Sequence, residues 1–263
     1  MADGFVIETT DLRKRYDGVE ALRGLTLAVP AGSICGFLGR TGAGKTTTIK
    51  ILLGMASPTS GRATVFGLPA DSPSASVDIR RRTGFVGDDK GLYDGMTVRG
   101  MVRHTASFYP KWNRDMEDRY LRKFELPAER GIKDLSRGMR TKLALLLAIC
   151  RGADLLVLDE PTTALDPAAT EDVLQAIVGH AAEHGTTVFF SSHQLGEVEQ
   201  IADHVVIIDR GRAAVAGGLD DLKQGYRRIQ LVFDREAPAY MFQTKGVERV
   251  KRSGRVMTVL SSA

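Results

Sequence analysis

The amino-acid sequence predicts an α/β fold built around a largely parallel β-sheet. Short β-branched or apolar runs alternate with helical periodicity along most of the 263 residues, as they do in strands joined by crossover helices. A glycine-rich segment at residues 39–44 separates one apolar run from a helical stretch, and Asp159 and Glu160 end another run. Runs this apolar are expected to be strands covered by helices on both faces.

The expected elements follow in chain order. Runs of β-branched or apolar residues predict strands at 6–8, 24–29, 34–38, 62–66, 84–86, 155–158, 187–191 and 205–209. Helical periodicity predicts helices at 44–55, at 97–125 with a break at Tyr109-Pro110, and at 137–151. Asp166-Pro167 has the residue types of a helix start, so a helix is expected from there to Gly185, and another begins near Gln194.

The sequence changes character after residue 225. Residues 228–233 and 256–260 alternate like half-buried strands, which predicts the start of a small α+β extension over 225–263, behind a main domain over 1–224. The last strand is expected to leave an open sheet edge. We therefore expect the chain to continue beyond Ala263 or another segment to pair there.

Composition limits the classes of protein that fit. Hydrophobic residues make up 43% of the chain, enough for a packed core, and a formal net charge of +4 is too weak to argue for nucleic acid. Cys35 and Cys150 lie in apolar runs and are expected to be buried free thiols of a reducing compartment. No secretion signal is expected at the N-terminus, and the longest apolar run, 143–150, is too short to cross a membrane.

Residues 39–46 fit the pattern of a phosphate-binding loop between a strand and a helix. Glycines let backbone N–H groups curve around a polyphosphate, and the helix N-terminus adds positive partial charge. The Lys45 ammonium is expected to neutralise β and γ oxygens, and the Thr46 hydroxyl to ligate Mg²⁺. The predicted nucleotide-binding residues here are Gly39, Arg40, Thr41, Gly42, Ala43, Gly44, Lys45, Thr46 and Thr47.

Two further motifs carry chemistry. The Asp159 carboxylate, at a strand end, can reach the metal from the side opposite Thr46, and Glu160 is expected to be the general base toward the attacking water. Adjacent acids at a strand end are often only solvated, but the phosphate loop favours the catalytic interpretation. Ser136 and Gly138 begin another apolar helix, where free N–H groups bind an anion; the alternative is an ordinary N-cap by Ser136.

In this order the motifs resemble those of the ATP-binding subunit of an ABC transporter, over residues 5–222. Residues 39–46 resemble Walker A, 155–159 Walker B, 135–139 the family signature, 163–166 the D-loop, and Ser192-His193 the switch histidine. The resemblance implies a RecA-like P-loop NTPase core with an N-terminal antiparallel β subdomain and a helical insertion at about 91–151. It also implies a head-to-tail dimer that holds ATP and Mg²⁺ between one protomer's phosphate loop and the other's signature.

The resemblance also assigns roles to single residues. Tyr16 matches the aromatic residue that stacks on adenine, and His193 the residue that contacts the γ-phosphate. Asp166 matches the residue that couples the two sites across the dimer. Asp88 stands where the family places a glutamine that contacts Mg²⁺ and water. A carboxylate can ligate the metal but cannot donate a hydrogen bond, so altered coupling is expected.

The expected function is ATP hydrolysis that drives a separate membrane permease, in the narrower group of bacterial exporter ATPases of the bacitracin-resistance and acetoin-utilisation type. The dimer is expected to be a homodimer or a heterodimer with a related subunit, cytoplasmic and peripheral on the inner face of the cell membrane, with no nucleic acid. A soluble ABC-family ATPase and a regulatory nucleotide-binding module not coupled to transport are the alternatives. The three arginines at 80–82 are expected to be a solvated helix face, or else a contact with lipid or permease.

Overall fold

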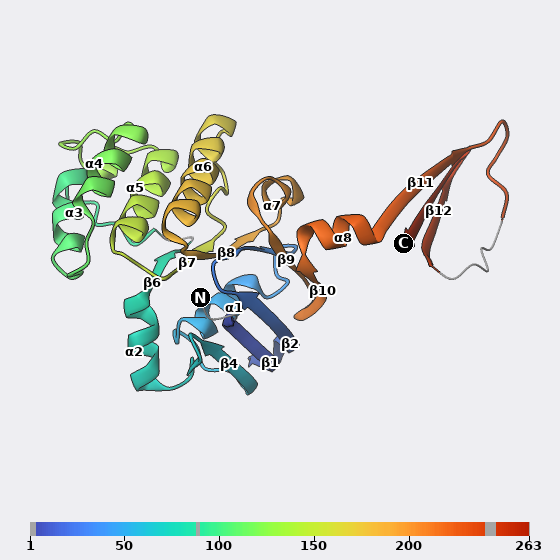
Figure 1. Ribbon diagram of the computed structural model, residues 1–263, viewed down its shortest axis with the longest axis horizontal. Helices are drawn as coiled ribbons and strands as arrows, with labels where there is room; N and C mark the ends of the chain where they lie inside the picture. Colours follow the sequence, from blue (N-terminus) through green and yellow to red (C-terminus); the bar gives the residue numbers. More distant parts are fainter. Residues whose placement is uncertain (1–3, 88–89, 240–245, 263) are drawn as a thin grey trace. The chain divides into compact units, whose positions relative to one another are not determined.

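The computed structural model describes residues 4–87, 90–239 and 246–262, and the chain divides into two compact units, Met1–Ala216 and Gly217–Ala263 (Figure 1). The strands that begin in the first unit are β1 (Phe5–Tyr16), β2 (Val19–Pro30), β3 (Ile34–Leu38), β4 (Ser60–Val65), β5 (Leu68–Pro69), β6 (Thr83–Val86), β7 (Leu155–Asp159), β8 (Thr187–Ser192), β9 (His204–Asp209) and β10 (Arg212–Gly218). Its helices are α1 (Lys45–Leu52), α2 (Pro73–Arg82), α3 (Val98–Ala106), α4 (Arg114–Lys123), the 3₁₀ helix η1 (Ile132–Asp134), α5 (Arg137–Cys150), α6 (Pro167–His184) and α7 (Leu195–Ile201).

A six-stranded sheet of order β10-β9-β3-β8-β7-β6 lies at the centre of the first unit. Its strands from β9 to β6 run parallel to their neighbours. Every residue of β7 and β8 is buried, because both faces of these strands are covered. The α/β class predicted from the alternation of strands and helices is confirmed.

A second sheet, of order β2-β1-β4-β5, is antiparallel. Its inward side chains, among them Ile7 and Leu25, belong to the same hydrophobic cluster as Phe37 of β3 and Val157 of β7. Burial along β1 and β2 alternates, as it does in a sheet with one covered face. The two sheets therefore share one core, and that core holds the ends of β3 and β7 in place.

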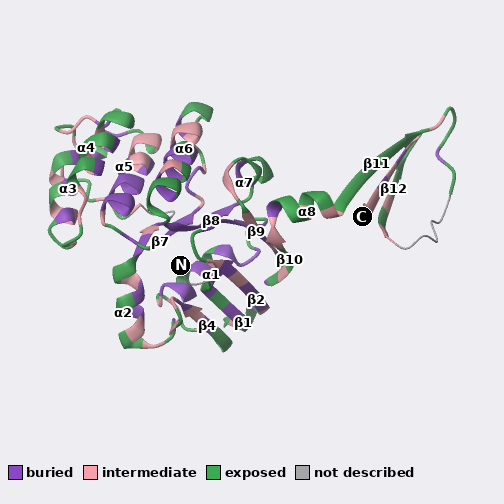
Figure 2. Ribbon diagram, in the orientation of Figure 1, coloured by how far each residue is buried: buried purple, intermediate pink, exposed green. Residues whose placement is uncertain are grey.

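Helices α3, α4, α5 and α6 lie together in the green-to-yellow part of Figure 1, with α5 in contact with the other three. The break expected at Tyr109-Pro110 is confirmed, because α3 ends at Ala106 and α4 begins at Arg114. The Asn113 side chain caps α4 by accepting a hydrogen bond from the Met116 N–H. In Figure 2, α5 is largely purple, as expected for its run of leucine and alanine.

The arginines at 80–82 occupy the last turn of α2. They are not simply solvated: Arg80 Nη1 donates to the Leu53 carbonyl oxygen at 3.0 Å, and Arg82 Nε donates to Asp154 Oδ2 at 2.7 Å. Arg81 instead forms an ion pair within α2, with its Nη1 3.4 Å from Asp78 Oδ1. This basic run therefore ties α2 to two neighbouring segments of the first unit.

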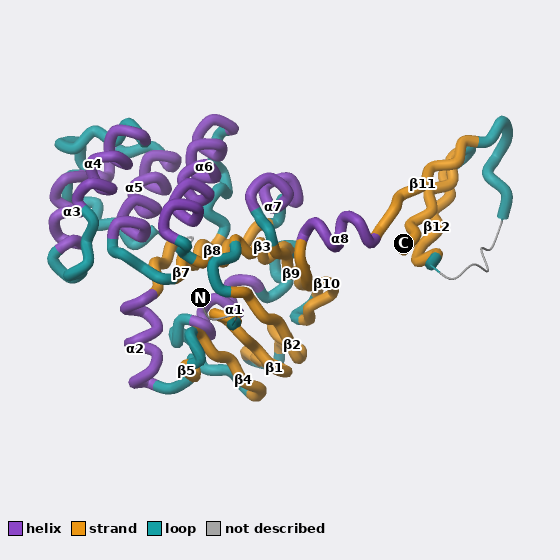
Figure 3. Tube along the Cα trace, in the orientation of Figure 1, coloured by secondary structure: helices purple, strands orange, loops and turns teal. Residues whose placement is uncertain are grey.

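The second unit contains α8 (Leu219–Gly225), β11 (Tyr226–Val232), β12 (Val247–Ser253) and β13 (Val256–Ser262). Its strands form an antiparallel sheet of order β11-β13-β12, drawn in orange in Figure 3. The last strand does not leave an open edge, because β13 lies between the other two. Of the two outcomes expected there, the pairing of another segment is confirmed, since β12 pairs with β13. The sequence analysis missed β12, since its Val247 and Val250 are three residues apart and a bulge interrupts the pairing between them.

Both cysteines are buried free thiols, as expected. Burial raises the pKa of both Cys35 and Cys150, that of Cys150 to about 12, so both sulfurs stay protonated at neutral pH. Within residues 4–87, 90–239 and 246–262, no helix has the length and apolar character needed to cross a bilayer.

Candidate functional site

The phosphate-loop motif connects β3 to α1. Gly44, the N-cap of α1, has a φ of 114°, and a Cβ there would come within 2.7 Å of the Leu22 side chain and 2.9 Å of the Ala21 carbonyl oxygen. Gly42 has a φ of 80° with open space beside it. Glycine adopts these positive φ values without strain because it has no Cβ. The loop therefore turns tightly against β2 and presents its backbone to the open side.

Lys45 is the first residue of α1, and only 6% of its surface is exposed. Its Nζ donates to the Gly39 carbonyl oxygen at 2.6 Å and to the Arg40 carbonyl oxygen at 3.3 Å. The same Nζ lies 3.0 Å from Glu160 Oε1. A buried ammonium needs such partners, and here they hold the cation at the mouth of the loop.

Glu160 follows β7 directly and has a φ of 50°, which turns its side chain toward the phosphate loop. Its Oε2 accepts hydrogen bonds from Thr163 Oγ1 at 2.8 Å and from His193 Nδ1 at 2.7 Å. Burial alone would raise the pKa of Glu160, but the hydrogen bonds from His193, Thr163 and Lys45 outweigh it, and the pKa lies below its usual value. The carboxylate is therefore ionised at neutral pH.

Asp159 is the last residue of β7 and is almost completely buried. Its Oδ1 accepts a hydrogen bond from Ser191 Oγ at 2.6 Å, and that same hydroxyl oxygen accepts one from the Glu160 N–H at 2.9 Å. In the parallel pairing of β7 and β8, Asp159 is the register partner of Ser191. One hydroxyl group thus positions both acidic residues.

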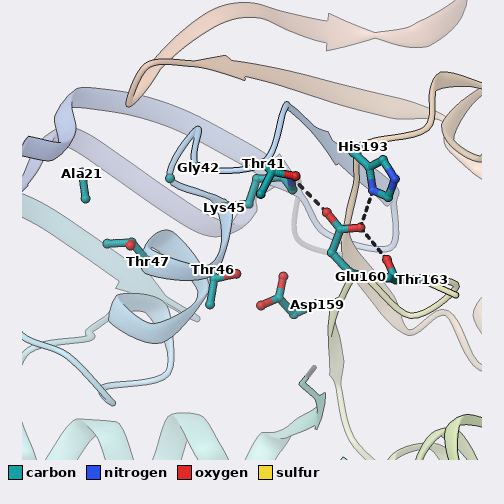
Figure 4. A pocket seen from close by; sticks show the side chains of 11 residues that line it. Ala21, Thr41, Gly42, Lys45, Thr46, Thr47, Asp159, Glu160, Thr163 and His193 are labelled. Carbon is teal, nitrogen blue, oxygen red and sulfur yellow. Dashed lines mark hydrogen bonds and ion pairs between the residues drawn. The ribbon is translucent and has the colours of Figure 1, made fainter. Parts of the chain in front are cut away.

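A cavity of about 330 Å³ brings these groups together. Figure 4 shows Lys45, Thr163 and His193 meeting at Glu160, while Asp159 and Thr46 point toward one another beside them. The lining residues are Ala21, Thr41, Gly42, Gly44, Lys45, Thr46, Thr47, Asp159, Glu160, Thr163 and His193. Sequence reasoning identified most of them but did not assign a site role to Ala21, Thr163 or the supporting Ser191.

Some expected site residues do not line this cavity. Tyr16 ends β1 with 42% of its surface exposed, and the Lys14 ammonium lies 4.6 Å from its ring centre. Ser136 caps α5 by accepting a hydrogen bond from the Met139 N–H at 3.2 Å, as the alternative interpretation of that motif expected. Asp166 likewise caps α6 through the Ala169 N–H. The remaining expected residues that are absent from the cavity lining are Gly39, Arg40, Ala43 and Gly138.

Asp88, which was expected to contact nucleotide and metal, lies outside the described residues. Two oxygen-bearing residues proposed for Mg²⁺ do lie in the cavity. Thr46 offers a hydroxyl, and Asp159 keeps its second carboxylate oxygen free of the Ser191 hydrogen bond. Oxygen donors facing one another suit a hard divalent cation that retains several waters. The donor set therefore fits Mg²⁺ bound together with a polyphosphate.

Comparison with known sequences gives a consistent result. The sequence profile of the ABC transporter family matches residues 22–163. The bacitracin transport ATP-binding protein BcrA of Bacillus licheniformis is 37% identical over 225 residues, which are 85% of this chain and 73% of that protein. The daunorubicin/doxorubicin resistance ATP-binding protein DrrA of Streptomyces peucetius is 38% identical over 226 residues, 82% of this chain and 66% of that protein.

Solved structures resemble the chain as well. One, described as the ATP binding subunit of an ABC transporter, has a TM-score of 0.73 and 29% identity, and the match covers 83% of this chain and 92% of that one. Another, cbiO1 from Clostridium perfringens, described as part of an ABC transporter complex, has a TM-score of 0.73 and 25% identity, with 84% and 91% covered.

Proposed function

This chain belongs to the ABC transporter family, and from that premise we propose that it powers export through a separate membrane permease. It is the ATP-binding and ATP-hydrolysing subunit of a bacterial ABC transporter, with the RecA-like P-loop NTPase fold of ABC ATPase cassettes. We propose in addition the direction of transport, the coupling to a permease, the dimer and the roles of single residues. The observation that carries the residue roles in hydrolysis is the cluster of Lys45, Glu160, Thr163 and His193 around one cavity.

Export is supported by the kind of relative that the chain resembles. BcrA is named for bacitracin transport and DrrA for resistance to daunorubicin and doxorubicin, and resistance to a toxic compound is consistent with its removal from the cell. The nickel import ATP-binding protein NikO of Rhodobacter capsulatus is 36% identical over 77% of this chain. We propose the direction from the resistance relatives rather than from NikO. ATP-dependent transport into inverted membrane vesicles that contain this ATPase and its permease measures the direction.

The residues divide the work of hydrolysis between them. We propose that the loop backbone and Lys45 bind the triphosphate, that Thr46 and Asp159 hold Mg²⁺, and that Glu160 accepts the proton of the attacking water. Mg²⁺, when bound, neutralises charge on the phosphate oxygens. The low pKa of Glu160 keeps its carboxylate available as a base at neutral pH. His193 Nδ1 donates to that carboxylate, so the imidazole orients the base.

We propose that two copies of the ATPase, or one copy and a related subunit, close around ATP at the inner face of the membrane. Ser136 and Gly138 lie outside the cavity of their own chain, so their N–H groups serve the cavity of the second copy in this proposal. Tyr16 would stack on adenine, Asp166 would couple the two sites, and Asp88 would replace the usual glutamine beside the metal. ATP favours the closed state only if it binds that state more tightly.

The test is a mass measurement on purified protein with and without ATP. Glu160→Gln retains the geometry of the side chain but removes its basicity, so ATP is expected to hold this variant as a dimer. Lys45→Ala removes the buried ammonium and is expected to abolish both ATP binding and ATP-dependent dimerisation. Retention of ATP binding in Lys45→Ala, or a Glu160→Gln variant that stays monomeric with ATP bound, contradicts the proposal.

A further inference from the structure

The second unit carries the net charge of the whole molecule. Residues 217–263 contain nine Lys or Arg and five Asp or Glu, so they alone account for the formal net charge of +4, while residues 1–216 are neutral overall. Charge this unevenly distributed indicates an interaction with an anion on the small unit. The sheet β11-β13-β12 determines where that charge is displayed.

Strand register places three of the five cations of β11 and β12 on one face of the sheet, and the other two, Arg227 and Arg252, on the opposite face. Arg228 of β11 and Arg249 of β12 are both register partners of Leu260 in the central strand β13, and Lys251 is the partner of Thr258. Alternation along a strand places residues two apart on the same face, so these three cations lie on one face, here called the cationic face. Arg228 and Arg249 are two strand spacings apart, about 10 Å.

The cationic face also carries apolar and aromatic groups. Tyr226 and Val232 alternate with Arg228 on β11 and are 47% and 73% exposed. Every residue of β11 is exposed, as the green strand in Figure 2 shows. Leu260, between the two arginines, is half-buried. Cations next to an exposed aromatic ring and aliphatic side chains match the boundary between lipid headgroups and acyl chains.

Packing within the unit does not use the cationic face. The buried residues Met257 and Val259 belong to the opposite face of β13 and pack with Ala237 and Phe233. Within the three strands the only carboxylate is that of Glu248, and it accepts a hydrogen bond from Ser262 Oγ at 3.0 Å. The three cations are therefore not part of the small core, and a single carboxylate on their strands, that of Glu248, stands against three positive charges.

We propose that the cationic face is a docking surface for an anionic phospholipid bilayer. A sheet face with cations spread over two outer strands fits a layer of phosphate groups better than it fits one extended acidic peptide, whose charges would follow a single row. Exposed Tyr226 and Val232 suit a lipid boundary and would gain nothing from a nucleic-acid backbone. The choice of a membrane rests in part on the proposed function, which places the ATPase beside a permease.

The test is flotation of the full chain with vesicles of phosphatidylcholine alone and with vesicles that also contain phosphatidylglycerol. Binding is expected only to the anionic vesicles and is expected to fall as salt rises. Each cation near an anionic surface contributes about fivefold to partitioning, so Arg228→Gln, Arg249→Gln and Lys251→Gln together should weaken it on the order of 100-fold. The charge-conserving set Arg228→Lys, Arg249→Lys and Lys251→Arg should retain it.

A matched control removes three exposed cations from the first unit, with Arg62→Gln, Arg122→Gln and Lys123→Gln, and should leave vesicle binding unchanged. Equal loss in the control set, or binding that ignores phosphatidylglycerol, overturns the proposal. So does binding of double-stranded DNA under conditions where the vesicles stay free. ATP hydrolysis in solution is expected to be the same in all sets, which separates this result from a failure of the proposed function.

Discussion

The two compact units of the chain hold their polar side chains in opposite ways. In the first unit, Lys45, Asp159 and Glu160 lie against fully buried strands, and each has at least one hydrogen-bond partner within 3.0 Å. In the second unit, the cations of the sheet stand exposed, and the core cluster among the described residues consists of Ala237, Met257 and Val259. Hydrolysis requires catalytic side chains that are held in position by the groups around them. Attraction to a charged surface requires only that the cations lie on the same face.

The largest effect is expected from the base in the first unit. Glu160→Gln should reduce steady-state phosphate release roughly 10³-fold, because the amide cannot accept the proton of water. Glu236→Gln, an exposed carboxylate of the second unit, should leave the rate unchanged. A rate that falls equally in both variants would mean that the chemistry is not confined to the first unit.

The second prediction concerns the thin core of the small unit. Met257→Ala truncates a buried side chain of that core and should destabilise the sheet by about 3 kcal/mol. Faster hydrogen exchange is expected in β11, β12 and β13, with unchanged exchange in β3, β7 and β8. Phosphate release should not change. Loss of ATP hydrolysis in this variant would show that the units depend on each other more than their separate cores indicate.

The third prediction concerns the buried, uncharged His180 of the first unit. His180 on α6 is 2% exposed, stacks on His184, and neither ring nitrogen has a hydrogen-bond partner among the described residues. Burial, and then the nearby His184, lower its pKa to about 4, below the usual 6.5. Between these values the unfolded chain binds more protons, so the free energy of unfolding should fall by about 2 kcal/mol from pH 7 to pH 5.

Urea unfolding of the wild type and of His180→Leu at the two pH values measures this term. The leucine variant lacks the titrating ring, so its loss of stability on acidification should be smaller by that amount. Identical pH dependence in the two proteins would mean that water or a proton reaches the ring in the folded state.

The smallest expected effect belongs to a hydrogen bond that supports the base. Thr163→Val deletes the hydroxyl that donates to Glu160 Oε2, so the pKa of Glu160 should rise. The acid limb of the pH–rate profile should then move to higher pH, with a few-fold loss at most near neutrality. A limb that stays in place, together with an unchanged rate, would remove Thr163 from the site.

Local signals made much of the first unit predictable from sequence. The glycines at 42 and 44 indicate left-handed backbone. Pro110 predicts the break between α3 and α4. The role of Ser191 was not predictable in this way. It depends on the register of β7 against β8, which brings residue 191 beside residue 159, and no local pattern encodes that pairing.

The second unit was harder to predict because its topology is not local. Residues 228–233 and 256–260 alternate clearly, but their order in the sheet depends on β12, whose charged residues and bulge conceal its alternation. The exposed edges therefore belong to β11 and β12 rather than to the last strand. The cationic face follows from this strand order, which no local sequence pattern encodes.

The central position of β13 has a consequence for biosynthesis. Both β11 and β12 bond to a strand that follows them in the chain, so neither can complete its ladder until residues 256–262 have left the ribosome. Domains nearer the N-terminus generally fold first during translation. The first unit is thus expected to fold before the second. Strands β11 and β12 of the second unit stay unpaired until residues 256–262 emerge from the ribosome.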